Sequence, residues 1–288
     1  MTAKILVVGA LGNVGAEVLT SLQERGVSVR AGDISPEKIQ ERFGEGVEPV
    51  LFNFGLRETF GPALNGIEKV FLMRPPQIVD VKKFIFPAID AAKAAGVKHI
   101  VFLSLIGIEQ NTIVPHYKVE QYLKASGLSC TFLRCSFFMQ NLNTTHQAEI
   151  RDNDEIYVPV GKARTSFIDV RDIGAVAAAA LTQPGHENKA YDLTGKEALD
   201  YFQVADLFST VLGRKIIYKN PTGLQFFIRQ IRRKSKLSFA LVTTWLYSNT
   251  RKGMADQVTG EVKRLTGREP ICMRQYIEDY QGYWRRAS

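Results

Sequence analysis

The sequence predicts an α/β fold, in which a doubly wound parallel sheet is followed by a smaller, mainly helical C-terminal lobe. Three observations support this prediction. Short apolar runs alternate with amphipathic segments up to about residue 135, a glycine-rich turn follows the first run, and helical patterns dominate after residue 199. Strands that alternate with helices form parallel sheets with right-handed crossovers. The 288 residues suffice for one large α/β domain with an added lobe.

The first strand and the turn after it form the most specific feature. Ile5–Val8 is an apolar run as long as a buried parallel strand. The turn Gly9-Ala-Leu-Gly-Asn-Val-Gly15 follows, and then a helical segment that Gly26 closes. In such a unit the glycines permit a tight turn and let the backbone approach a pyrophosphate, which free N–H groups of the helix N-terminus bind.

This turn therefore predicts a Rossmann-type, dinucleotide-binding domain. The alternative is a tight strand-to-helix turn without a ligand, because the spacing is G-x-x-G-x-x-G instead of G-x-G-x-x-G. The turn residues that we expect to contact the cofactor are Gly9, Ala10, Leu11, Gly12, Asn13 and Val14.

The alternation of strands and helices continues to residue 134. Apolar runs predict further strands at 27–32, 50–54, 69–73, 98–104 and 130–134. Amphipathic segments, several of them closed by glycine, predict helices at 36–43, 56–64, 81–95 and 114–125.

The pattern changes after residue 135. We expect short strands at 154–158, 165–168 and 190–193. An alanine-rich helix at 170–181 has Asp169 as its expected N-cap and Asp172 in its first turn. Further helices are expected at 201–212, 224–233, 237–247, 255–265 and 273–284.

These elements predict a division into two parts. Residues 1–139 are expected to form the dinucleotide-binding domain, with 165–195 returning to its sheet, and 140–288 to form the smaller lobe. Open α/β sheets bind ligands at the carboxyl ends of their strands, so we expect the lobe to cover the substrate there.

The positive charge of the chain is concentrated in one segment. The formal net charge is +8, and residues 214–252 contain ten Lys or Arg and no Asp or Glu. The simplest interpretation is a solvated helix surface. More specific alternatives are that the segment binds an acidic protein partner, a phosphate-rich surface or an anionic substrate. No nucleic-acid-reading motif accompanies the charge, so we expect no specific nucleic-acid binding.

Several function classes are not expected. The three cysteines are odd in number and lack C-x-x-C spacing, which favours a reducing compartment without a zinc site or disulfide framework. No secretory or membrane-spanning segment is apparent, so we expect a cytoplasmic protein without membrane contact. No metal site, P-loop lysine or G-x-S-x-G motif is present.

A set of short motifs, in order along nearly the whole chain, resembles the NmrA-like group of atypical short-chain dehydrogenase/reductases. The motifs are the glycine turn, Arg74-Pro-Pro, His116-Tyr-Lys-Val-Glu120, Leu133-Arg-Cys-Ser-Phe-Phe-Met-Gln-Asn141, Phe167-Ile-Asp-Val-Arg-Asp-Ile-Gly174, Tyr191-Asp-Leu-Thr-Gly195 and Leu265-Thr-Gly-Arg268. The resemblance implies an NAD(P)H-dependent reductase of quinones, azo dyes or triphenylmethane dyes, a biosynthetic reductase, or a nucleotide-sensing regulator without chemistry.

The sequence departs from the wider superfamily at the proton donor. That superfamily uses a Tyr-x-x-x-Lys pair, commonly with a Glu four residues after the Lys. Alignment on Glu120 puts His116 at the Lys position and Thr112 at the Tyr position, and Tyr117 is followed by Gln121 instead of Lys. The usual acid is therefore absent, as it is from the NmrA-like proteins that the sequence resembles.

Two residues are candidates for catalysis. His116 can bond the nicotinamide ribose or deliver a proton, since the ordinary imidazole pKa lies near neutrality. Ser104, at the end of the fifth expected strand, can contact nicotinamide or substrate. The alternatives are a histidine on the rim of the site and a hydroxyl that satisfies nearby backbone.

Other residues are candidates for cofactor contact. Asn53 and Phe54 end the third expected strand, where the resembling family contacts adenine. The end of the fourth strand and the segment after the sixth contribute Met73, Arg74, Pro75, Ser136, Phe137 and Phe138. For Arg74 and the two phenylalanines, a surface position and a core position are the respective alternatives.

The cofactor preference depends on the end of the second strand. Asp33 lies 18 residues after Gly15, near the position of a ribose-binding acid, and Ile34 occupies the place where NADP-using relatives commonly have Arg. Arg30 lies on the opposite strand face. We therefore expect NAD(H) to be preferred over NADP(H), unless Asp33 only caps the loop before Pro36.

Two functions follow from these features. The first is an NAD(P)H-dependent oxidoreductase that transfers hydride to a small conjugated or aromatic acceptor, which needs little acid assistance. The second is a non-catalytic redox sensor that docks a protein partner through residues 214–252.

Overall fold

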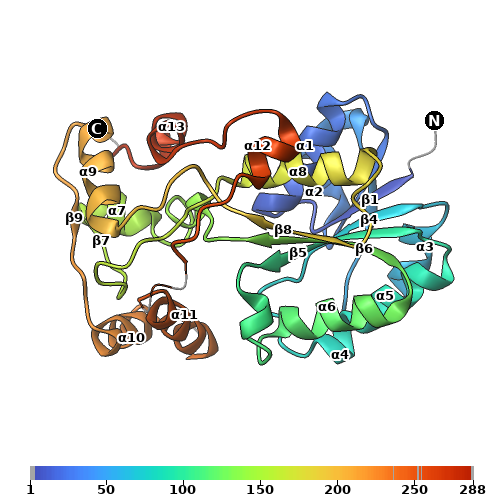
Figure 1. The fold of residues 1–288 in the computed structure, drawn as a ribbon, viewed down its shortest axis with the longest axis horizontal. Coiled ribbons are helices and arrows are strands. Elements are labelled where there is room, and N and C mark those ends of the chain that lie inside the picture. The colour runs from blue at the N-terminus through green and yellow to red at the C-terminus, as the bar shows by residue number, and fades with distance from the viewer. Residues whose placement is uncertain (1–3, 236, 252, 254, 287–288) are drawn as a thin grey trace. The chain divides into compact units, whose positions relative to one another are not determined.

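The computed structural model describes residues 4–286 except 236, 252 and 254, and divides them into two compact units. The first unit contains the residues up to Cys135 together with Val170–Leu193 and Glu261–Arg268. The second contains Ser136–Asp169, Thr194–Gly260 and the residues from Glu269 onward. Figure 1 labels helices and strands of both units.

The first unit is built on a parallel sheet that has seven strands over the described residues. The strand order is β3-β2-β1-β4-β5-β6-β8, and every pairing is parallel. The strands are β1 (Ile5–Val8), β2 (Val29–Asp33), β3 (Glu48–Leu51), β4 (Lys69–Leu72), β5 (His99–Leu105), β6 (Ser129–Cys135) and β8 (Lys189–Leu193). The predicted doubly wound Rossmann-type sheet is confirmed, and its order reverses between β1 and β4, where such sheets bind ligands.

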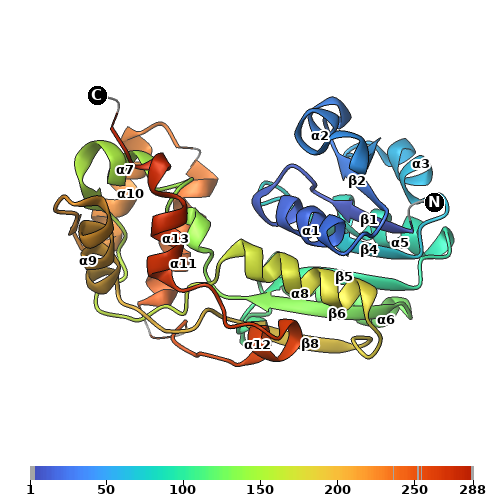
Figure 2. The same cartoon turned by 90° about the horizontal axis from the view of Figure 1, so that it is seen from above.

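Helices cover both faces of this sheet (Figures 1 and 2). One face carries α1 (Asn13–Glu24), α2 (Pro36–Phe43), α8 (Val170–Thr182) and α12 (Glu261–Thr266). The other carries α3 (Phe60–Leu64), α4 (Val81–Phe84), α5 (Phe86–Ala94) and α6 (Pro115–Ser126). Helices α1 and α8 pack so closely that a Cβ at Gly174 of α8 would lie 2.6 Å from the carbonyl oxygen of Glu17 in α1.

The core of the sheet explains why these segments form strands and helices. Leu6 and Val8 from β1 pack with Val70 from β4 and Ile100 from β5, all nearly inaccessible to solvent. Such continuous apolar runs are stable only where helices cover both faces of the sheet.

The second unit is mainly helical. Its helices are α7 (Gln147–Asn153), α9 (Tyr201–Leu212), α10 (Gly223–Arg232), α11 (Leu237–Thr250) and α13 (Met273–Asp279). A short parallel pair joins β7 (Glu155–Ile156) to β9 (Ile217–Tyr218). Capping boxes at Asp200 and Thr222 begin α9 and α10. Trp284, Tyr276 and Phe208 are fully buried in its core.

Short 3-10 helices complete the described secondary structure at Gly44–Gly46, Arg57–Thr59, Ile108–Gln110, Met139–Asn141 and Gln281–Tyr283. None of the helices in the described part of the chain is both long and apolar enough to cross a bilayer.

Several predicted elements differ from the structure. The helix expected at 81–95 is divided into α4 and α5, that expected at 56–64 begins as a 3-10 turn, and that expected at 273–284 ends at Asp279. Residues 165–168 form isolated bridges, Thr165 to Leu199 and Ile168 to Phe138, instead of a strand. The expected helix at 255–265 is wrong for its first half, since only Glu261–Thr266 is helical and the carbonyl of Ala255 accepts from Ser166 N–H. The third strand ends at Leu51 instead of 54, because Phe52 and Phe54 leave the sheet to join the core.

Candidate functional site

The glycine turn after β1 has two glycines that the fold itself requires. Gly9 has φ +79°, and a Cβ there would lie 2.6 Å from the Met73 sulfur. A Cβ on Gly15 would lie 2.1 Å from the carbonyl oxygen of Gly9. At Gly12, by contrast, the nearest atom would be that carbonyl at 3.2 Å, and the nearest side-chain atom would be 3.8 Å away. Internal packing therefore explains Gly9 and Gly15 better than it explains Gly12.

The N-terminus of α1 is suited to an anion. Gly12 is its N-cap and provides no side-chain hydrogen bond, and the first turn has no acidic residue. The N–H groups of an uncapped first turn point outward and carry the positive end of the helix dipole. The turn thus combines a glycine at the start of the helix with backbone donors for a phosphate, so its residues fit a dinucleotide.

Asp33 ends β2 and is tied to the glycine turn. Its Oδ2 accepts from the Leu11 N–H at 3.0 Å and its Oδ1 from the Ile34 N–H at 2.8 Å. Ile34 is 65% exposed. Arg30 is occupied elsewhere, because it pairs with Glu48 and donates to backbone carbonyls of 63 and 65. Asp33 is therefore an acid at the expected position with part of its accepting capacity in use.

The sequence prediction did not include Arg42. This exposed residue of α2 donates through Nη1 to the Leu11 carbonyl at 3.4 Å. It thus brings a cation to the same turn that the Asp33 carboxylate contacts. A basic residue in the last turn of the helix after β2 was the signal in the sequence.

The residues after β3 divide between surface and core. Asn53 Oδ1 accepts from the Gly55 N–H at 2.8 Å, so this side of the amide shapes the loop. Phe54 is 8% exposed and meets Phe52 edge to face at 5.2 Å between ring centroids. The structure places Phe54 in the core of the first unit, where it supports the loop of Asn53.

Arg74, just after β4, is a cation with unusual surroundings. Its Nη1 donates to the carbonyls of Pro75, Pro76 and Ile78 at 2.6–3.2 Å and so holds this loop. Its Nε is buried and has no partner, and no carboxylate among the described residues pairs with it. Burial lowers the pKa of Arg74 to about 10. A largely buried guanidinium without a counter-ion is costly, and an anionic ligand would compensate its charge.

His116 lies in the first turn of α6, after Pro115. Burial, and then the charge of Arg74, lowers the pKa of His116 to about 3. The imidazole is therefore neutral across the physiological range and suited to accepting or donating a hydrogen bond. Its ring lies 6.1 Å from that of Phe102. Proton transfer near neutral pH would require a much higher pKa than this environment gives.

Ser104 has an internal partner. It is fully buried, and its hydroxyl donates to Glu120 Oε1 at 2.6 Å. Glu120 also accepts from Arg134 at 2.9 and 3.2 Å, and Arg134 donates to Glu109 at 2.6 Å. This network links β5, α6 and β6. It gives Ser104 a structural role, and sequence spacing alone did not reveal it.

The expected nicotinamide residues after β6 belong to the second unit. Ser136 Oγ is buried and accepts from Ser166 at 3.1 Å. Phe137 stacks on Tyr247 at 6.1 Å between ring centroids, and Phe138 is bridged to Ile168. Both phenylalanines are partly exposed, so neither is a closed core residue.

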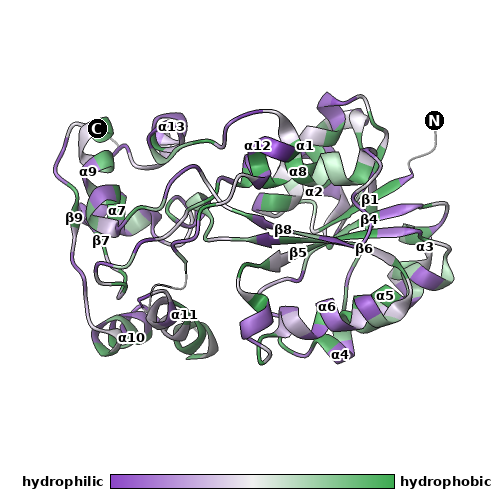
Figure 3. Ribbon diagram, viewed as in Figure 1, coloured by the Kyte–Doolittle hydropathy of each residue, from purple (hydrophilic) through white to green (hydrophobic). Residues whose placement is uncertain are grey.

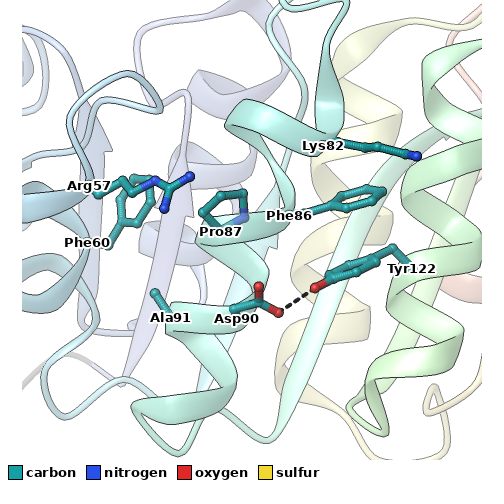
Figure 4. A pocket seen from close by; sticks show the side chains of 8 residues that line it. All are labelled: Arg57, Phe60, Lys82, Phe86, Pro87, Asp90, Ala91 and Tyr122. Carbon is teal, nitrogen blue, oxygen red and sulfur yellow. Dashed lines mark hydrogen bonds between the residues drawn. The ribbon is translucent and has the colours of Figure 1, made fainter.

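A pocket of about 510 Å³ lies on the outer helices of the first unit (Figure 4). Phe86 stacks on Tyr122, whose hydroxyl donates to Asp90 at 2.7 Å. The residues that line this pocket are Arg57, Phe60, Lys82, Phe86, Pro87, Asp90, Ala91 and Tyr122. None of the expected site residues is among them.

Other expected features can be placed as well. In the described part of the chain, no group of three His, Cys, Asp or Glu side chains could hold a metal ion. Cys130, Cys135 and Cys272 are free thiols. Burial raises the pKa of Cys130 to about 12, so this thiol is unreactive.

The basic segment is partly neutralised within its own unit. Arg214 pairs with Asp154, Arg229 with Glu155, and Arg233 Nη1 with Glu149 Oε1 at 2.6 Å. These carboxylates lie 60–85 residues earlier in the chain. Only part of the positive charge of 214–252 is thus left for another molecule. Lys236 and Lys252 lie outside the described residues.

Comparison with known proteins identifies the family. The model of the NmrA-like family matches residues 1–266. The chain belongs to the NmrA-like family. This confirms the resemblance to NmrA-like atypical short-chain dehydrogenase/reductases that the motifs suggested.

Similar proteins of this family include named reductases. The chain is 40% identical over 280 residues to the NAD(P)H azoreductase of Xenophilus azovorans, covering 95% of this chain and 96% of the relative. It is 34% identical to a (4-alkanoyl-5-oxo-2,5-dihydrofuran-3-yl)methyl phosphate reductase of Streptomyces griseus, covering 96% and 97%. The NADPH complex of an Escherichia coli quinone oxidoreductase matches with a TM-score of 0.87 at 23% identity, covering 96% and 99%, and supports the fold.

Proposed function

We propose that this NmrA-like protein is an NAD(P)H-dependent reductase that transfers hydride to a small conjugated or aromatic acceptor. The observation that carries the proposal is the glycine turn at the β1/β4 switch point, whose Gly12 is less constrained by internal packing than Gly9 or Gly15 and begins an uncapped helix. The 40% identity to an NAD(P)H azoreductase supports it. Acceptors that are easily reduced fit a chain without the Tyr-x-x-x-Lys pair.

The chain's own residues would bind and orient the cofactor, which when bound supplies the hydride. The N–H groups of residues 13–15 would bind the pyrophosphate, since the Gly12 N–H donates to the Gly9 carbonyl, and Asp33 would accept from the adenosine ribose. Asn53 offers the free nitrogen of its amide to adenine. Arg74 compensates its buried charge with an anionic group, and neutral His116 bonds a ribose hydroxyl.

Ser136, Phe137 and Phe138, which follow β6 directly along the chain, would contact the nicotinamide and the acceptor. Partly exposed aromatic rings provide apolar surface for a planar acceptor and exclude water from it. Met73 and Pro75 shape the edge of the site beside the glycine turn. Ser104 bonds Glu120 of α6 and so helps to hold the helix whose first turn carries His116.

We also propose that NAD(H) is preferred over NADP(H). A carboxylate at Asp33 accepts from ribose hydroxyls and repels a 2′-phosphate, and exposed Ile34 offers no charge to that phosphate. The structure adds the cation of Arg42 to this turn, and its charge opposes the preference.

A second candidate is a sensor without chemistry that docks a protein partner through residues 214–252. It is favoured by the neutral His116 and by Thr112 at the position of the usual tyrosine. Mixing the protein and NADH or NADPH with a panel of quinones, azo dyes and enones separates the two. Oxidation of the reduced nicotinamide supports the reductase, and tight cofactor binding without turnover across the panel supports the sensor.

A further inference from the structure

Helices α10 and α11 carry an unusual amount of exposed apolar surface. Nine of the eighteen large apolar side chains that are exposed in the described part of the chain fall within residues 224–246. Figure 3 shows hydrophobic positions along both helices. Exposed apolar groups concentrated in this way mark a contact surface more often than scattered ones do.

On α10 the exposed residues form a stripe. Leu224, Ile228 and Ile231 are 69%, 41% and 42% exposed and lie four and three residues apart, which places them on one helix face. Phe226, on another face, is 1% exposed and packs into the core of the second unit. The helix is therefore anchored by one apolar face while it presents a second to solvent.

Helix α11 repeats this arrangement. Leu241, Val242 and Trp245 are 54%, 58% and 45% exposed on one face, which Leu237 and Leu246 extend. The opposite face is fixed, since Tyr247 is buried and its hydroxyl lies 2.8 Å from His146 Nε2. The exposed face is thus a stable feature of a packed helix.

The charge beside these stripes is positive throughout. No Asp or Glu occurs from residue 214 to 252. Arg229 and Arg233 are paired with Glu155 and Glu149. Arg232 and Lys234, at the turn between the helices, are exposed, and no carboxylate of the described chain pairs with them. Free cations therefore accompany the exposed apolar stripes.

We propose that the α10–α11 hairpin docks on the surface of an anionic lipid bilayer. Leu, Ile, Phe and Trp side chains would enter the headgroup boundary, and Arg232 and Lys234 would meet lipid phosphates. The 14 residues of α11 are about 21 Å long, too short to span the hydrocarbon core, so the helix would lie in the plane of the interface. The expectation of no membrane contact considered only spanning segments.

Charge selects this occupant over a second copy of the chain. In a symmetric dimer the same patch faces itself, so Arg232 and Lys234 of each copy would approach those of the other without a carboxylate in the hairpin to separate them. An anionic surface complements both the apolar stripes and the cations. The inference does not depend on which acceptor is reduced.

The two tryptophans make a direct test possible. Trp245 is 45% exposed and Trp284 is fully buried, so a change in tryptophan emission on binding reports mainly on α11. The full-length protein is mixed with vesicles of phosphatidylcholine alone or with added phosphatidylglycerol. We expect a blue shift and co-sedimentation with the anionic vesicles, at least tenfold weaker binding to neutral ones, and loss of binding with added salt.

Three double variants complete the test. Leu241→Gln with Val242→Gln, and Arg232→Gln with Lys234→Gln, should each weaken vesicle binding at least tenfold. The matched control is Ile217→Gln with Val258→Gln, two apolar residues that are each 46% exposed outside the hairpin, and it should bind like the wild type. Absence of binding at any lipid composition overturns the proposal. Equal loss in the control, or self-association that the Leu241/Val242 variant abolishes, overturns it too.

Discussion

The carboxylate of Asp33 accepts a hydrogen bond from the backbone N–H of Leu11 at 3.0 Å, so the acid at the end of β2 also fixes the glycine turn. Charge and turn geometry can therefore be separated. Asp33→Asn keeps an oxygen for Leu11 but removes the charge. We expect it to bind NADPH at least tenfold more tightly than the wild type, because the repulsion of a 2′-phosphate is gone.

Measured dissociation constants for NADH and NADPH check this prediction. Asp33→Ala combined with Ile34→Arg should reverse the preference, and Arg42→Ala should weaken NADPH binding alone. Equal affinity of the wild type for both cofactors would show that Asp33 does not discriminate at the ribose.

The glycines of the turn should respond differently to substitution. Gly12→Val should leave the fold intact and lower cofactor affinity at least tenfold, about 1.4 kcal/mol. Its Cβ would lie 3.2 Å from the Gly9 carbonyl oxygen, which needs only a small shift, but the branched side chain would occupy the place of a pyrophosphate. Gly15→Ala should destabilise the fold by about 1–3 kcal/mol or more, since its Cβ would lie 2.1 Å from a backbone oxygen. Denaturant unfolding and cofactor titration distinguish the two effects. Unchanged cofactor affinity in a folded Gly12→Val variant would show that the turn joins strand and helix without binding the cofactor.

His116 should contribute to cofactor binding but should not produce a limb in the pH–rate profile. Its pKa is lowered to about 3 by burial and by Arg74, so it stays neutral between about pH 5 and 9. His116→Gln should raise the KM for the reduced cofactor several-fold and leave the shape of the pH–rate profile unchanged. If the wild type has a limb near neutral pH that disappears in this variant, His116 does donate a proton in the reaction.

Acid should destabilise the first unit through His99. This residue is 3% exposed, and its buried Nδ1 has no partner. Its Nε2 lies 2.8 Å from the Thr131 hydroxyl, which donates to the His186 carbonyl and therefore accepts from His99. Burial, and then the charge of Lys69, lowers the pKa of His99 to about 4. Between pH ~6.5 and ~4 the unfolded chain binds this proton and the folded chain does not, so stability falls as pH falls, by up to about 1.4 kcal/mol per pH unit.

The variant His99→Gln keeps a donor for Thr131 and removes the titration. Free energies of unfolding in denaturant at pH 7 and pH 5 should therefore differ less in the variant than in the wild type. Identical pH dependence in both proteins would mean that other groups account for the acid sensitivity.

Much of the fold was predictable because it depends on local pattern. Ile5–Val8, Pro36–Phe43 and Tyr201–Leu212 begin and end as predicted, since apolar periodicity and capping residues bound them. The helix expected from residue 255 failed because Ala255 is held by the distant Ser166, a tertiary contact that no local pattern reveals.

The candidate site was predictable where backbone geometry decides it. The glycine turn and Asp33 follow from spacing, and the structure places them together. The partners of Ser104 and Arg233 were not predictable, because Glu120 and Glu149 reach them only through packing of separate elements. The strand-end position of Ser104 therefore suggested a hydroxyl that contacts nicotinamide or substrate, and the charge of 214–252 suggested a solvated basic helix surface, where the structure has internal pairs.

The proposed reductase holds a reduced nicotinamide that gives hydride to an acceptor. A nicotinamide held in one orientation gives that hydride from one face only. Cofactor deuterated at C4 in either configuration tests it most directly, with an acceptor from the panel and the mass of the oxidised cofactor as the measurement. We expect one labelled form to yield oxidised cofactor without deuterium and the other to keep it. Oxidation without preference between the two forms, or bound cofactor that no acceptor oxidises, would contradict the account.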